Sequence, residues 1–259
     1  MSDFVPAPAP RRALGTLLVL LAAGLVGIAS LALAPVENLL PEGTDVPRGL
    51  LLIQPAVLTV LFAVLGWWAA PKSGLDAPII GGLVTGGNAG EAFRGALRPA
   101  VLVAAASAAV LVIFGWATAE YTAPIASKLP LPLATKLLYG GITEKIIARW
   151  GLLSGALALA VHAGMARDRA FWLVNIVVSL LFGAGHLGIV YAVDASPTGY
   201  ILAAVLAGNI VPSLMFGWLF RIRGIECAMM AHAARTSWPR WQPWRSRPER
   251  TARSNPGGT

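Results

Sequence analysis

Three ionisable side chains lie close together in an otherwise apolar stretch of the chain: Glu144, Lys145 and Arg149. Each costs about 2.5–3.5 kcal/mol near the centre of a membrane helix. Two histidines, His186 and His232, follow in later apolar segments. A carboxylate can act as a general base, and an imidazole can stabilise developing negative charge. These residues therefore predict a polar site cut into a bundle of helices.

The composition places the chain in a membrane. Its 259 residues are 56% hydrophobic and only 12% charged, whereas a soluble domain carries about 25% charged residues. Several apolar runs exceed the roughly 18 residues needed to cross a bilayer. The net charge is +8, and the basic residues lie mostly in tails and loops, which indicates contact with anionic lipid and not with nucleic acid. A single cysteine, Cys227, excludes an intrachain disulfide.

The apolar runs predict an all-α, polytopic membrane bundle of about seven or eight hydrophobic helices. The chain divides into an N-terminal tail (1–12), a transmembrane domain (13–237) and a basic C-terminal tail (238–259) for which disorder is expected. Residues 72–99 mix glycines with charged residues and are expected on the membrane surface. The predicted hydrophobic segments are 14–34, 49–70, 100–118, 136–164, 170–193, 199–220 and the short 224–237.

The loop charges predict an orientation. If successive segments alternate in direction, the loops on the N-terminal side carry nine basic residues and the opposite loops carry three. This asymmetry favours a cytoplasmic N-terminus. The same alternation places Glu144, His186, Asn209 and His232 in one half of the membrane, opposite the N-terminus. Their shared depth favours a common site.

These residues carry a family resemblance. The run Gly141–Gly151, which reads GITEKIIARWG, is similar to the Glu-Glu-x-x-x-Arg motif of the CPBP family of intramembrane glutamic endopeptidases, which includes the CAAX prenyl protease 2 type. The run Phe182–His186 matches the Phe-x-x-x-His motif of that family. Asn209 resembles a residue of its penultimate helix, and the run Ala231–Thr236 resembles its last motif, His-x-x-x-Asn/Asp.

The resemblance implies proteolysis within the bilayer, with a membrane-associated protein or peptide as the substrate. Glu144 and His186 would activate a water molecule, and His232 would stabilise the oxyanion. Arg149, Asn209 and the two residues that depart from the motifs, Lys145 and Thr236, would support the site. The resemblance implies no cofactor. With an Ala-, Gly- and Arg-rich composition, we expect an integral protein of a bacterial cytoplasmic membrane.

The two departures make specific predictions. Lys145 replaces the second glutamate of the family and faces Arg149 four residues later, so Glu144 or Glu226 should supply the counter-charge. Because adjacent helical residues diverge by about 100°, Lys145 should point away from the cavity that Glu144 faces, toward a carboxylate, a carbonyl or the interface. Thr236 stands at the Asn/Asp position, where a hydroxyl can still donate one hydrogen bond.

Other interpretations stay open at this level. Glu144, His186 and His232 could bind zinc and leave one position for water, although the chain has no His-Glu-x-x-His motif. Glu144 and Arg149 could form a structural ion pair. Asn209 could bond between helices. The chain could also be a non-catalytic scaffold or interaction protein of the same family.

Overall fold

The computed structural model describes residues 10–237 apart from 41–43 and 45, so the predicted C-terminal tail lies outside the described residues. Every regular element of the described residues is a helix, which confirms the predicted all-α fold. Five helical stretches are long and apolar enough to cross a membrane. They are Leu14–Leu33, Arg48–Ser73, Ala89–Trp116, Arg167–Ala192 and Gly199–Arg223. The other two predicted segments, 136–164 and 224–237, are also largely helical.

The elements follow one another as α1 (Pro10–Ser30), η1 (Leu31–Leu33), η2 (Val36–Leu39), α2 (Arg48–Leu51), α3 (Ile53–Ser73), α4 (Pro78–Thr85), α5 (Ala89–Lys128), α6 (Leu133–Thr135), η3 (Lys136–Thr143), η4 (Ile146–Leu153), α7 (Ser154–His162), α8 (Arg167–Gly185), α9 (Leu187–Val193), α10 (Gly199–Arg223) and α11 (Ile225–Ser237).

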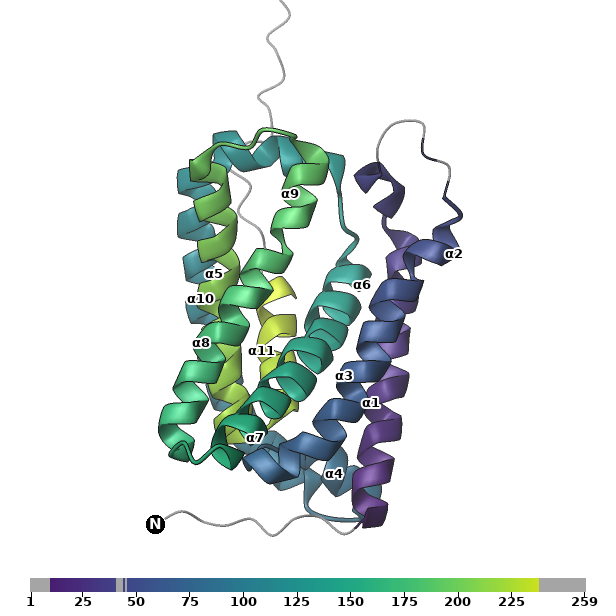
Figure 1. Ribbon diagram of the computed structural model, residues 1–259, viewed down its shortest axis with the longest axis vertical. Coiled ribbons are helices and arrows are strands. Elements are labelled where there is room, and N and C mark those ends of the chain that lie inside the picture. Colours follow the sequence, from purple (N-terminus) through teal and green to yellow (C-terminus); the bar gives the residue numbers. More distant parts are fainter. Residues whose placement is uncertain (1–9, 41–43, 45, 238–259) are drawn as a thin grey trace, which may run out of the picture.

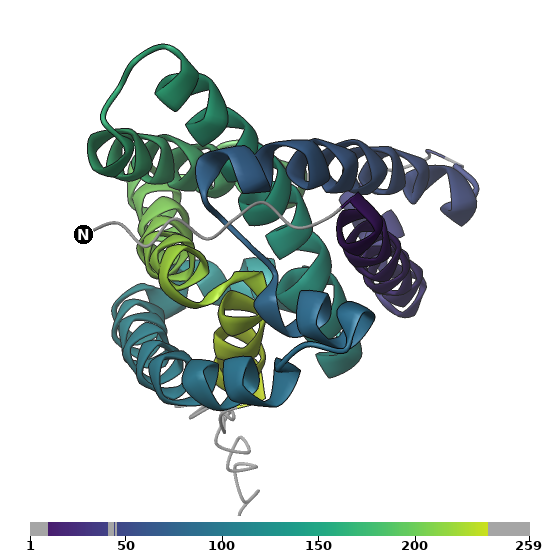
Figure 2. The ribbon, with the colours of Figure 1, turned by 90° about the horizontal axis from the view of Figure 1, so that it is seen from below.

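The long helices run alternately up and down (Figure 1). We call the end at which α1, α5, α8 and α11 begin the N-terminal end, and the opposite end, which carries α2 and α9, the distal end. In the view onto the N-terminal end, α1 and α3 lie on one side of the helix that runs from α6 to α7, whereas α5, α10 and α11 lie on the other (Figure 2). The central helix therefore separates two groups of helices.

Residues 89–99, which fall in the segment predicted for the membrane surface, form the first turns of the 40-residue helix α5. The side chain of Asn88 explains this start. Its Oδ1 accepts a hydrogen bond from the Glu91 backbone N–H (3.2 Å), and its Nδ2 donates to the Glu91 carboxylate (2.6 Å). Asn88 therefore acts as an N-cap, because its side-chain oxygen satisfies a free backbone N–H of the first turn.

The central helix is continuous from Leu133 to His162, but two of its stretches, η3 and η4, are π-helical. In these stretches the backbone bonds span five residues instead of four. Glu144 and Lys145 lie at the junction between them. Such turns are rare and are frequent at functional sites, so the predicted site falls where this helix is irregular.

Close contacts with α3 fix the rotation of the central helix. Trp150 lies against Gly66, where a Cβ would come within 2.2 Å of the ring, and its indole N–H donates to the Ala63 carbonyl (3.1 Å). Gly151 faces Phe62 in the same way, since a Cβ there would lie only 2.4 Å from Phe62 Cβ. The face that carries Trp150 and Gly151 is thus held against α3. The opposite face of the central helix carries Lys145 and lies toward α8, α10 and α11.

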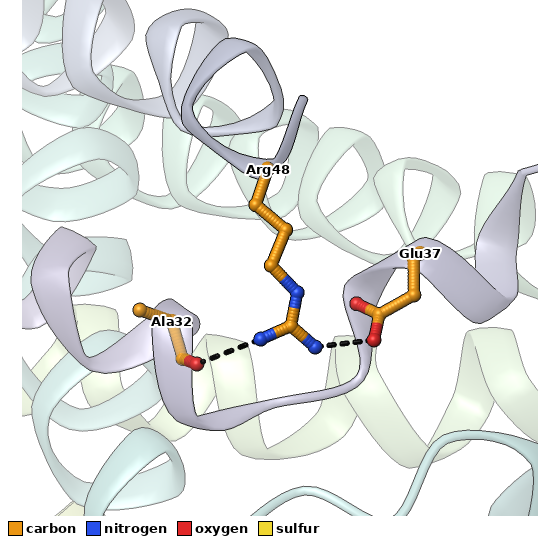
Figure 3. Close-up of polar contacts among 3 residues, drawn as sticks. All are labelled: Ala32, Glu37 and Arg48. Atoms are coloured by element: carbon orange, nitrogen blue, oxygen red, sulfur yellow. Dashed lines mark hydrogen bonds and ion pairs between the residues drawn. The ribbon is translucent and has the colours of Figure 1, made fainter. Parts of the chain in front are cut away.

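At the distal end, one arginine ties the loop after α1 to the start of α2. Arg48 donates to the Ala32 carbonyl (3.4 Å) and to the Glu37 carboxylate (Figure 3). The hydrogen bond from Arg48 lowers the pKa of the Glu37 carboxyl below its ordinary value. We call these contacts of Arg48 the arginine clip. The Arg48 guanidinium is therefore bound by partners within the protein.

Candidate active site

Glu144 and His232 approach each other over Gly140. A Cβ on Gly140 would lie 3.8 Å from Glu144 Oε2 and 3.3 Å from His232 Nε2. The absence of a side chain on Gly140 therefore leaves room between the carboxylate and the imidazole. Glu144 comes from the π-helical junction and His232 from α11, which packs against η3. Two residues 88 positions apart in the sequence are thus brought to one place.

The surroundings of His232 are aromatic and cationic. Its imidazole lies 5.6 Å from the Phe216 ring, centroid to centroid. Arg235, one turn further along α11, places Nη2 3.3 Å from His232 Nε2 and 3.5 Å from Nδ1. The Arg235 guanidinium also lies 5.6 Å from the Phe216 centroid. His232 is 7% exposed, so these charges act where water screens them little.

Lys145 reaches a carbonyl, as expected, but it does not turn away from the site. Its ammonium donates to the Gly140 carbonyl (3.1 Å). It also lies 5.4 Å from the Phe182 centroid and 5.1 Å from the Phe216 centroid. Phe216 contacts His232, so the predicted orientation of Lys145 is wrong. The expected 100° divergence assumed a regular α-helix, and π-helical stretches flank Lys145 on both sides.

Arg149 is fully buried and has no carboxylate partner among the described residues. Its guanidinium donates to Asn175 Oδ1 (3.0 Å), to Ser179 Oγ (3.4 Å) and to Ser213 Oγ. Among the described residues, the ion pairs do not include Glu144, so neither the predicted counter-charge nor the structural ion pair with Arg149 is present. Gly217 makes room for this network, since a Cβ there would lie 1.8 Å from Asn175 Oδ1.

The residues around Arg149 were missed by the sequence analysis. Asn175 and Ser179 are four residues apart in the apolar helix α8, so they share one face. A pair of small polar residues at this spacing in a membrane helix could have indicated a buried hydrogen-bonding partner. Ser213 offers no comparable signal, because it is a single hydroxyl residue next to Pro212 in α10.

Glu226 serves a different element. Its Oε1 accepts a hydrogen bond from the Ile80 backbone N–H (2.8 Å) in the first turn of α4. An acidic side chain at this position satisfies a free N–H and the positive end of the helix dipole. Glu226 therefore fastens the start of α11 to α4, and the expected contribution of Glu226 as a counter-charge for Arg149 is not observed.

His186 lies at the break between α8 and α9. Its Nδ1 is 2.8 Å from the Phe182 carbonyl oxygen, and its ring packs edge-on against Phe182 at 4.7 Å between centroids. It makes no hydrogen bond with Glu144 or His232 in the described structure. Its connection to the other site residues runs through the Phe182 ring, which also contacts the Lys145 ammonium.

Among the described residues, neither Asn209 nor Thr236 makes a hydrogen bond to Glu144 or His232. Asn209 Nδ2 donates to the Val205 carbonyl of its own helix (2.8 Å), so its amide hydrogen bond stays within α10. Thr236 lies half-buried on α11, four residues after His232. Within the described residues, no three His, Cys, Asp or Glu side chains are grouped closely enough to hold a metal ion. The three proposed zinc ligands are thus not assembled as a set.

The comparison with family models matches residues 126–237, under the description Type II CAAX prenyl endopeptidase Rce1-like. This segment contains every site residue described above, from Gly140 to Thr236, and the match confirms the resemblance to the CPBP family. No curated protein matches the chain, and no solved structure matches it. The match and the apolar helices together define an integral membrane protein with a protease-family segment.

Proposed function

We propose that this protein is an intramembrane peptidase that hydrolyses a peptide bond of a membrane-associated protein or peptide. The observation that carries the proposal is the approach of Glu144 and His232 over Gly140, within the segment that matches the endopeptidase family. A carboxylate beside an imidazole, with open space between them, suits the activation of a water molecule and the binding of a carbonyl oxygen.

In the proposed reaction, Glu144 accepts a proton from water while the water oxygen attacks the peptide carbonyl carbon. The carbonyl oxygen gains negative charge on the side of His232. The Arg235 guanidinium and the Lys145 ammonium lie on that side, against the Phe216 ring. Positive groups aimed at developing charge in a dry site lower the barrier. Glu144 then returns its proton to the leaving nitrogen as the C–N bond breaks.

His186 has a predicted role as the second water activator. Its Nδ1 is engaged by the Phe182 carbonyl, which leaves Nε2 as the nitrogen available for substrate or water. Its position at the α8–α9 break suits a group that moves on substrate binding, because element termini absorb backbone changes more readily than helix interiors.

One observation favours a second candidate function, that of a non-catalytic membrane scaffold of the same family. Lys145 is 3% exposed and stands at the position of the family's second glutamate. Its ammonium contacts a carbonyl and two aromatic rings instead of the arginine that the family motif would pair there. A reversal of charge at this position is expected to change what the site can bind.

Peptide hydrolysis by the purified, reconstituted protein distinguishes the two functions. Glu144→Gln keeps the size of the side chain and is expected to lower activity about 10²- to 10⁴-fold, as the loss of a general base does. Activity that survives this change would exclude Glu144 as the base. An inactive wild-type protein that gains activity through Lys145→Glu would establish the non-catalytic interpretation. Metal analysis and chelator treatment of the same preparation test the zinc alternative.

A further inference from the structure

Three arginines gather at the N-terminal end of the bundle. Arg94 and Arg98 lie one turn apart on α5, and Arg223 comes from the end of α10, which packs against α5. The Arg223 Nη1 atom would lie 4.0 Å from a Cβ on Gly95, between the two α5 arginines in sequence. We call these three residues the arginine triad. Figure 2 looks onto the end of the bundle where they lie.

The arginine triad has no carboxylate partner in the described structure. All three side chains are exposed, and none lies within 4.0 Å of an acidic group. Glu91, one turn before Arg94, is engaged by Asn88. Like charges four residues apart on a helix repel one another, so an anion between Arg94 and Arg98 would relieve this repulsion. By contrast, the arginine at the distal end, Arg48, is held by Glu37 and Ala32 (Figure 3).

Exposed apolar side chains continue from the arginine triad toward the middle of the bundle. On α5, Leu97 is 40% and Val101 is 56% exposed, and on α10, Ile222 is 40% and Trp218 is 38% exposed. A phosphate group would meet guanidinium donors at the end of these helices, and acyl chains would meet the apolar residues beyond them. Tryptophan at this level is typical of the membrane–water interface.

We propose that the arginine triad binds the headgroup of an anionic phospholipid, whose acyl chains lie along α5 and α10. Guanidinium groups bind phosphate oxygens with paired hydrogen bonds. The exposed apolar side chains beside the triad favour a lipid over a free phosphate ion as the ligand. The proposal stands independently of the peptidase activity, because the triad lies at the N-terminal end and none of its residues contacts Glu144 or His232.

The test uses the full-length protein in a neutral detergent, titrated with phosphatidylglycerol and followed by native mass spectrometry. The triad variant replaces all three arginines with glutamine. A basic residue in direct contact with the bound headgroup is expected to contribute roughly 1 kcal/mol, about fivefold in affinity, so the triad variant is expected to bind about 100-fold more weakly. The matched control replaces Lys72, Arg167 and Arg169, which are exposed at the same end, and is expected to bind as the wild type does.

Three other results would overturn the proposed lipid site. Equal weakening in the triad variant and the control would show a general charge effect and overturn the site. Phosphatidylcholine that binds as well as phosphatidylglycerol would remove the requirement for an anionic headgroup. Inorganic phosphate that competes at the same concentration as the lipid would assign the site to a free anion. An unchanged elution profile and helical circular dichroism spectrum establish that each variant is folded.

Discussion

An alanine in place of Gly140 would add one methyl group between Glu144 and His232. The added Cβ would lie 3.3 Å from His232 Nε2 and 3.8 Å from Glu144 Oε2. The first distance is shorter than an ordinary carbon contact of about 3.5–4.0 Å, so the imidazole has to move by a few tenths of an ångström. The same methyl group occupies the space proposed for the water.

The magnitude follows from the sensitivity of catalysis to position. A displacement of about 1 Å can cost about 100-fold in rate, so a shift of a few tenths is expected to cost about fivefold in kcat/KM. The folded protein should not lose stability, because alanine is better than glycine inside a helix by about 0.5–1 kcal/mol. Gly140→Ala should therefore separate activity from stability.

Gly141→Ala is the matched control. A Cβ there would lie 3.6 Å from His232 Cδ2 and 3.9 Å from the Lys136 carbonyl oxygen, which are ordinary contacts. The two variants are compared by peptide hydrolysis, by thermal unfolding and by the chemical shifts of the labelled His232 imidazole. The shifts respond to Gly140→Ala even if hydrolysis is slow. Equal activity and equal shifts in both variants would refute the proposed closeness of Glu144 and His232 over Gly140.

The remaining predictions concern other parts of the bundle. Asn175→Ala removes an acceptor of the buried guanidinium and should lower the free energy of unfolding by about 1.5–3 kcal/mol, measured by thermal unfolding in detergent; no loss would contradict the importance of this bond. Single cysteines at the exposed positions Ala163 and Ser196, introduced after Cys227→Ser, report orientation: an impermeant maleimide should label Ser196→Cys in intact cells and Ala163→Cys only after permeabilisation, and the reverse pattern would invert the topology. The pKa of Glu37 is lowered in the folded protein, so the arginine clip stabilises the loop above the ordinary carboxyl pKa of about 4.5 and loses this contribution as the pH falls through the lowered pKa. The protection of that loop against hydrogen exchange, relative to the intrinsic rate, should fall in this acidic range, and Glu37→Gln should remove the pH dependence of this protection.

The sequence located the helices because hydropathy is a local property. Residues 199–220 were predicted as one hydrophobic segment and form most of α10. The start of α5 was misplaced because charged residues in its first turns masked the periodicity, although Asn88 is a residue type that favours the N-cap position. The motif around Glu144 was also recognisable, since the family resemblance depends on residue order alone and residues 126–237 match the family model.

The partners of the buried charges could not be predicted in this way. Lys145 contacts rings on α8 and α10, and Arg149 bonds to Asn175 and Ser213 on the same two helices. These contacts depend on how the central helix is rotated, and its rotation is fixed by the packing of Trp150 against α3.

The sequence by itself thus determined that the chain forms membrane helices and which of them carry ionisable residues. The length of an apolar run and the order of the residues in a motif depend only on neighbouring positions in the chain. The tertiary structure decided that Glu144 and His232 both lie beside Gly140 and that Lys145 turns toward the same site. It did so through close contacts at glycines such as Gly140 and through π-helical turns, which depend on neighbouring helices and leave no periodic signal in the sequence.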